Sequence, residues 1–140
     1  MATSALPAAR SDAAFNASLI AFVGRILIAA IFLLSGFAKL TAPAATIAYI
    51  QTAGLPAPSL AYWIALLAEL GGGILLVVGY RTRLVATGLA LFALATALGF
   101  HHDFADQNQF IHFFKNVAMA GGLLQVVAFG GGRLSVDARR

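Results

Sequence analysis

The sequence predicts an all-α fold, an integral membrane bundle of four transmembrane helices. The first observation is composition: of 140 residues, 61% are hydrophobic and only 10% are charged. Soluble domains are usually about 45–50% apolar and about 25% charged. The second observation is that the apolar residues gather into four long runs, and a helix needs about 20 such residues to cross a bilayer. The third is that most basic residues flank these runs, which is typical of membrane proteins.

The predicted spans cover residues 18–38, 60–79, 84–100 and 110–129. Together they form one domain, residues 18–129, at a length that suits a single compact unit. A short, poorly ordered cytoplasmic tail is predicted for residues 1–17, and a basic cytoplasmic tail for residues 130–140. In the connection after the first span, residues 43–52 favour a short interfacial helix that Gly54 would end.

The distribution of lysine and arginine predicts the orientation. One side of the predicted bundle carries most of the arginines, namely Arg10, Arg81, Arg83, Arg133, Arg139 and Arg140. The other side carries Lys39, Asp103 and Asp106. The positive-inside rule then places both termini in the cytoplasm. It also explains the net charge of +4 without a nucleic-acid partner.

Glu69 stands at the centre of the second predicted span. A charged side chain in the bilayer is costly unless it finds a partner or a wet cavity. Arg25 in the first span and Lys115 in the fourth are the predicted partners, so Glu69 should face the bundle interior near one or both. An echo between residues 72–78 and 121–127 would place Lys115 one helical turn outward of Glu69, where its long side chain could reach the carboxylate.

These positions define the candidate site. The candidate ligand- or proton-binding residues are Arg25, Lys39, Glu69, Lys115, Asn116 and Gln125. The glycines expected to let helices approach closely are Gly36, Gly72, Gly73, Gly121 and Gly122. Two interpretations remain open: the charges lock the bundle together, or they line a functional site, which is the usual role of ionisable groups inside a membrane.

The histidines and aromatic residues near the third loop are weaker candidates. His101, His102 and His112 are expected to be polar residues at a wet interface without a structural metal, although a haem between His112 and one of the other two is an alternative. Three aromatic residues could stack on a quinone or simply mark the membrane interface, namely Phe110, Phe113 and Phe114.

A set of short motifs resembles the DoxX family of small four-span bacterial membrane proteins. The motifs are Gly24-Arg25, Ser35-Gly36 with Lys39, Glu69-Leu70-Gly71-Gly72, Lys115-Asn116 and Gly121-Gly122. The resemblance covers most of the chain, from about Gly24 to Phe129. It implies a four-helix bundle in the bacterial cytoplasmic (inner) membrane. Relatives in this family include a subunit of a thiosulfate:quinone oxidoreductase and proteins linked to oxidative-stress complexes.

Three functions fit the sequence. The first is a membrane component of a quinone-linked or oxidative-stress redox system; the alternatives are a small proton-coupled transporter and a structural or assembly subunit without its own activity. The sequence identifies no cofactor, although a quinone fits the first hypothesis. Cysteine-ligated cofactors are excluded because the chain has no cysteine. The expected partners are the lipid bilayer and either a redox protein or a second copy of the chain.

The topology can be tested by single-cysteine labelling, which is clean in a cysteine-free chain. We expect a cysteine at position 105 to react with an impermeant thiol reagent from outside, and one at position 82 only from the cytoplasm, because the arginines lie on the cytoplasmic side. The reverse pattern would overturn the orientation.

Overall fold

The structure, a computed structural model, describes the backbone of residues 6–140 and the side chains of residues 14–140. Every regular element in this part of the chain is helical. The long elements are α1 (Leu6–Thr41), α5 (Thr82–Phe100) and α6 (Gln107–Phe129). Another long segment is built from α3 (Pro58–Leu66), the π-helix η1 (Leu67–Gly71) and α4 (Gly72–Val78). The short elements are α2 (Pro43–Thr52) and η2 (Asp137–Arg139).

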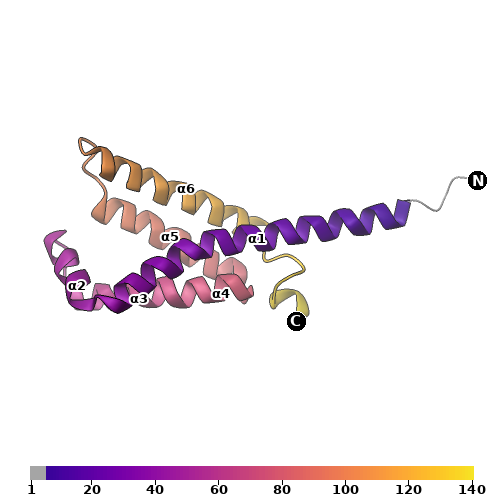
Figure 1. The fold of residues 1–140 in the computed structure, drawn as a ribbon, viewed down its shortest axis with the longest axis horizontal. Coiled ribbons are helices and arrows are strands. Elements are labelled where there is room, and N and C mark those ends of the chain that lie inside the picture. Colours follow the sequence, from indigo (N-terminus) through magenta and orange to yellow (C-terminus); the bar gives the residue numbers. More distant parts are fainter. Residues whose placement is uncertain (1–5) are drawn as a thin grey trace, which may run out of the picture.

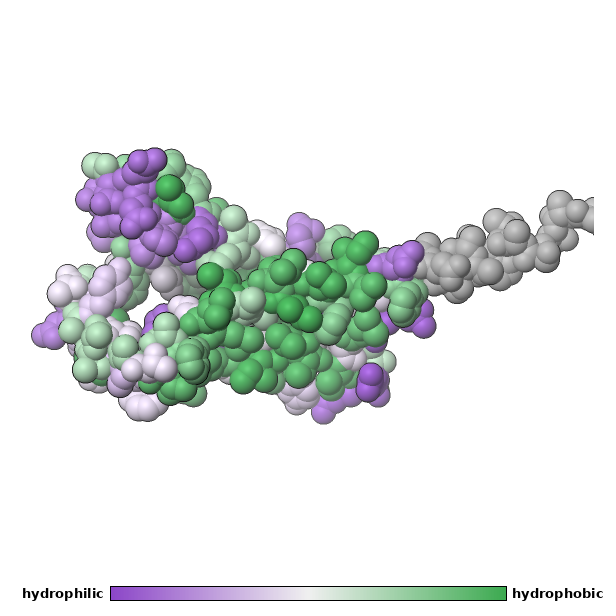
Figure 2. Space-filling model, viewed as in Figure 1, coloured by the Kyte–Doolittle hydropathy of each residue, from purple (hydrophilic) through white to green (hydrophobic). Residues whose placement is uncertain are grey.

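Four of these segments are long and apolar enough to cross a membrane. They are Ala14–Thr41, Pro58–Val78, Thr82–Phe100 and Gln107–Phe129. The predicted all-α four-span bundle is therefore confirmed. Figure 2 shows the expected surface: apolar residues cover its central face and hydrophilic residues gather toward both ends of the bundle.

The bundle has two different ends (Figure 1). At the α2 end, α2 follows α1 and lies across the bundle, and the loop between α5 and α6 lies near it. At the tail end, the C-terminal segment lies beside α1 and the end of α4. The α5–α6 hairpin packs closely with the other helices at the tail end and diverges from α1 and α3 toward the α2 end.

The structure confirms one local prediction and corrects another. Residues 43–52 do form a helix, with Pro43 in its first turn and Gly54 at φ +76° just beyond its end. The poorly ordered tail predicted for residues 1–17 is wrong from Leu6 onward, because α1 already begins there. The physical reason is the alanine content of residues 8–17, since alanine has the highest helix propensity.

Small residues bring the helices together at the core. On α5 the buried alanines recur at helical spacing, at Ala86, Ala90, Ala93 and Ala97. Four of the predicted packing glycines are in tight contacts, because a Cβ at Gly36, Gly72, Gly73 or Gly122 would lie 2.7–3.1 Å from a leucine or isoleucine side chain of another segment. A Cβ at Gly121 would meet no atom within 4 Å, so the packing role predicted for Gly121 is wrong.

Arg25 organises the tail end. Its guanidinium is buried, with 1% of the residue exposed, and donates hydrogen bonds to the carbonyl oxygens of Leu76 (2.8 Å), Val77 (3.2 Å) and Leu134 (2.6 Å). The last carbonyls of a helix have no partner within that helix and favour a nearby cation. Arg25 therefore satisfies the C-terminal end of α4 and joins it to the C-terminal segment.

Asp137 performs the complementary task at the start of α5. Its carboxylate accepts hydrogen bonds from the backbone N–H groups of Arg81 and Thr82, both at 2.7 Å, and from the Thr82 hydroxyl at 2.6 Å. These bonds from Thr82 and Arg81 hold the pKa of the Asp137 carboxyl below its ordinary value. Residues 130–140 are thus packed onto the bundle.

The burial of Thr82 affects the topology experiment. Thr82 is completely buried, so the neighbouring exposed Arg83 is the better cysteine-labelling position.

Candidate functional site

Glu69 lies on a π-helical turn in the middle of the second span. The turn covers Leu67–Gly71, between the α-helical segments α3 and α4. The three glycines that follow lower the steric barrier to an altered backbone turn. Such turns are rare and frequently occur at functional sites because they re-aim side chains within a helix. Here the turn places Glu69 in the bundle interior, with 5% of the residue exposed, as the sequence predicted.

The ion-pair partner of Glu69 is Lys39, near the end of α1. The Lys39 ammonium nitrogen lies 3.0 Å from Oε1 of Glu69 and 2.9 Å from Oε2. Ser35, one turn earlier on α1, accepts a hydrogen bond from Lys39 at 2.8 Å and donates one to Glu69 Oε1 at 3.1 Å. These three side chains, which we call the Lys39–Glu69 cluster, join α1 to the second span.

The predicted pairing of Glu69 with Arg25 or Lys115 is therefore wrong. Arg25 lies 14 residues before Lys39, which corresponds to about 21 Å along α1. It reaches the end of the second span rather than its centre. The sequence did single out Lys39 as a candidate, but as an interfacial cation of the outer side. Its long aliphatic chain lets the ammonium reach back into the bundle, a common behaviour of lysine at membrane interfaces.

A cavity of about 650 Å³ opens beside the Lys39–Glu69 cluster. Residues of α1, α2, α3, η1, α5 and α6 line it, and most of this lining is apolar. The aromatic side chains of the lining are Phe32, Tyr49, Phe92 and Phe100. Its volume falls within the range of about 300–1,000 Å³ typical of small-molecule sites. Figure 2 shows the surface hollowed at the α2 end, between the α5–α6 loop region and the rest of the bundle.

A second polar group lines the cavity from the α5–α6 hairpin. It consists of His101 at the end of α5 and His112, Lys115 and Asn116 on α6. The Lys115 ammonium lies 2.8 Å from Nδ1 of His112, and the rings of His101 and His112 stack with centroids 5.1 Å apart. Burial lowers the pKa of the His101 imidazole, and the nearby His112 and Lys115 lower it further. The sequence analysis named each of these residues as a candidate, but it did not predict that they line the same cavity.

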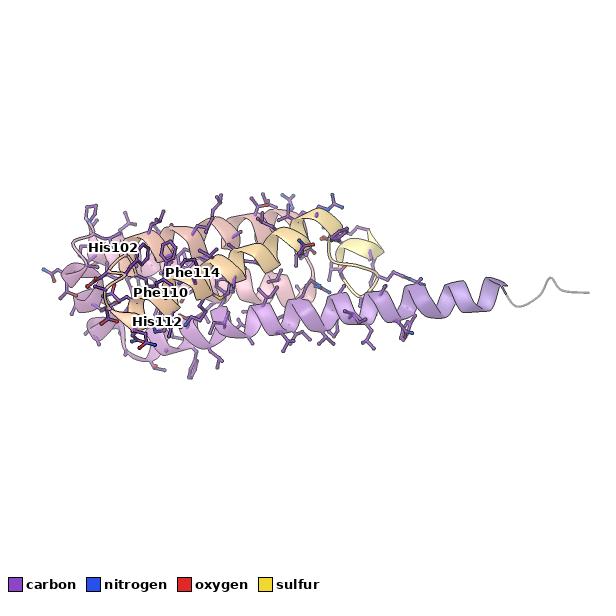
Figure 3. All side chains as sticks on the ribbon, turned by 90° about the horizontal axis from the view of Figure 1, so that it is seen from above. His102, Phe110, His112 and Phe114 are labelled. Carbon is purple, nitrogen blue, oxygen red and sulfur yellow. The ribbon has the colours of Figure 1, made fainter. Side chains whose placement is uncertain are left out.

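Other candidates lie away from this cavity. His102, Phe110 and Phe114 are exposed, and Figure 3 shows them with His112 at the α2 end of the molecule. Phe110, Phe113 and Phe114 form an aromatic cluster with Phe104, outside the cavity lining. Gln125 is exposed on α6 and also lies outside the lining.

The rings of His101 and His112 stack on each other, so a haem between these two would require the rings to separate. Among the residues that the structure describes, no three His, Cys, Asp or Glu side chains are grouped so as to hold a metal ion. The prediction that this loop binds no structural metal still awaits a measurement.

The fold and the site together define a small multi-pass membrane protein with a buried ion pair beside an apolar cavity. The chain belongs to the DoxX family, whose model matches residues 20–102. It is 36% identical over 115 residues to inner membrane protein YqjF of Escherichia coli (strain K12), which covers 82% of this chain and 87% of YqjF. It is also 36% identical over 123 residues to inner membrane protein YphA of the same organism, covering 84% and 87%. No solved structure matches the chain at significant similarity.

A double-mutant cycle tests the pairing. We expect Lys39→Met and Glu69→Gln to lower the unfolding free energy non-additively, with a coupling of about 0.5–3 kcal/mol, because each removes the partner of the other. Thermal unfolding in detergent measures this. The control is the cycle of Glu69→Gln with Lys115→Met, which should be additive. Coupling to Lys115 together with additivity at Lys39 would contradict the observed pairing.

Proposed function

We propose that the chain is the quinone-binding membrane component of a redox system and that the cavity holds the quinone ring. The observation that carries this proposal is an apolar cavity lined by two separate polar groups, one from α1 and η1 and the other from the end of α5 and from α6. Small-molecule sites commonly combine an apolar lining with a few convergent polar groups that orient the ligand. The names of YqjF and YphA place those proteins in the inner membrane. We propose the same location for this chain.

The cavity suits a flat ring with oxygen atoms on opposite edges. Aromatic side chains line it and can pack against the ring faces. At one wall Lys39 offers N–H groups beside Ser35 and Glu69, and at the other wall Lys115 and the two imidazoles do the same. A benzoquinone places one oxygen at each end of its ring, so each wall has a partner for one of them.

The cavity wall also provides a route for an isoprenoid or alkyl tail. Ile31 and Ile64 line the cavity, and 37% and 56% of their respective surfaces are exposed. We propose that the cavity opens toward lipid between these two residues. A ring could enter laterally while its tail stays in the hydrocarbon.

Electrons must come from elsewhere, because a cysteine-free chain offers no thiol couple. A partner redox protein at the membrane surface would supply or accept them, and this chain would bind and orient the quinone. With both termini in the cytoplasm, as the arginines predict, the cavity would open toward the outer half of the bilayer.

One observation also favours the second candidate, a proton-coupled carrier. An acidic side chain within a membrane-embedded cavity is the usual device of such carriers. This candidate requires pH-driven uptake of a solute into liposomes. The quinone proposal requires binding at a fixed pH, so the two can be separated by a binding measurement alone.

Filling the cavity provides the test. We expect Ala65→Phe, which places a ring in the cavity from α3, to weaken binding of a short-chain benzoquinone by at least about tenfold, or ~1.4 kcal/mol. Quenching of Trp63, the single tryptophan, reports binding in lipid nanodiscs. The matched control is Leu67→Phe, since Leu67 is 68% exposed and lies outside the cavity lining.

Wild-type protein that shows no saturable quenching would refute the proposal. Equal weakening by both phenylalanine substitutions would also refute it, because the ring would then bind on the lipid-facing surface. Unfolding temperatures of both variants should accompany the titrations, so that loss of fold is distinguished from loss of the site.

A further inference from the structure

We infer that the tail end of the bundle holds a second binding site, which takes the phosphate headgroup of an anionic phospholipid. The site is an open pocket of about 460 Å³ lined by Arg81, Arg83 and Leu84 of the α4–α5 region and by Asp137 of the C-terminal segment. We call it the arginine pocket. It lies at the opposite end of the bundle from the proposed quinone cavity, so the inference is independent of the proposed function.

The arginine pocket lies at the membrane level of phospholipid headgroups. Residues 79–81 alone join the membrane-crossing segments Pro58–Val78 and Thr82–Phe100, so Arg81 and Arg83 stay close to the ends of these apolar segments. Gly130, on the other side of the pocket lining, directly follows the segment Gln107–Phe129. A bilayer has its polar headgroup region immediately outside the hydrocarbon core. A headgroup phosphate is therefore within reach of the pocket.

The arginine pocket carries positive charge that no ion pair neutralises. Among the residues that the structure describes, the only ion pair is the one in the Lys39–Glu69 cluster. Arg81 and Arg83 are both exposed and line the pocket together. Basic pockets between transmembrane helices are typical sites for anionic lipid headgroups. The positive potential of the tail end is increased by three further exposed arginines, Arg133, Arg139 and Arg140.

Asp137, the acidic residue of the lining, is already engaged by the protein. Its carboxylate accepts hydrogen bonds from the backbone N–H groups of Arg81 and Thr82 and from the Thr82 hydroxyl. These bonds occupy the first N–H groups at the start of α5. An anion in the pocket would therefore bind to the two guanidinium groups and not to the helix terminus.

The guanidinium of Arg83 is held against the backbone of the C-terminal segment. Gly130 has φ +79°, and a Cβ there would lie 3.4 Å from Nε of Arg83 and 3.7 Å from its second terminal nitrogen. A guanidinium is a planar fork of N–H donors that matches the oxygens of a phosphate. Arg81, the N-cap residue of α5, brings a second guanidinium to the same pocket.

An apolar stripe leads from the arginine pocket along α5. Leu84 lines the pocket, and Leu84, Leu91 and Leu98 are all exposed. An α-helix has about 3.6 residues per turn, so residues seven apart lie on nearly the same face. Phe129, which precedes Gly130, is also exposed. A phospholipid has the same pattern of polarity, with acyl chains joined to a charged headgroup, whereas a free phosphate ion would use the arginines alone.

Native mass spectrometry of the detergent-solubilised protein tests the inference, with phosphatidylglycerol and phosphatidylcholine of identical acyl chains as probes. We expect the wild-type protein to bind phosphatidylglycerol at least about tenfold more tightly, because each arginine near a headgroup favours an anionic lipid. Replacing both pocket arginines, Arg81→Gln with Arg83→Gln, should reduce this ratio to about twofold or less. The matched control, Arg133→Gln with Arg139→Gln, removes the same charge outside the pocket lining and should keep most of the preference.

Three results would overturn the inference. The first is equal binding of the two lipids by the wild-type protein. The second is an equal loss of preference in both double variants, because net charge alone would then explain it. The third is displacement of phosphatidylglycerol by an equal concentration of free glycerol phosphate, because the headgroup alone would then suffice. If the pocket double variant does not fold, Arg83→Gln compared with Arg133→Gln decides in the same way.

Discussion

The ion pair between Lys39 and Glu69 is the constraint on which the rest of the structure depends. A charged residue at the centre of a transmembrane helix costs about 2.5–3.5 kcal/mol on insertion scales, so Glu69 needs a partner. Pairing requires α1 and the second span to lie side by side at this level. It also requires the π-helical turn that aims Glu69 inward and the close contact at Gly36, where a Cβ would lie 3.1 Å from the Cβ of Glu69.

The two ends of the bundle treat buried polar groups differently. At the tail end, Arg25 and Asp137 make hydrogen bonds to helix termini that would otherwise lack partners, and the C-terminal segment closes over them. At the α2 end, the helices diverge and the charged groups border a cavity. The first arrangement provides stability. The second leaves a cavity that the protein's own side chains do not fill, which is the physical basis for proposing a ligand at that end.

The sequence predicted the fold well because hydrophobic length and basic flanks depend on local composition. It predicted the interior location of Glu69 for the same reason, since a lone carboxylate in an apolar run has few alternatives. It did not predict the partner of Glu69. That choice depends on the register between α1 and the second span, on the extra residue of a π-helical turn and on the reach of a lysine chain. Lys39, His112 and Lys115 line a common cavity because the α5–α6 hairpin diverges from α1 and α3. No local sequence pattern predicts this divergence.

The central claim is that the cavity beside the Lys39–Glu69 cluster holds a membrane-soluble ring compound. The most direct measurement is photo-crosslinking of the protein in native membranes with a diazirine-bearing benzoquinone, followed by mass-spectrometric mapping of the labelled residues. The account predicts labels on cavity-lining residues such as Tyr49, Thr96 and Met119, suppressed by excess unlabelled quinone. Labels confined to outward-facing residues such as Ile20, Leu67 and Leu98, or insensitive to competition, would contradict it.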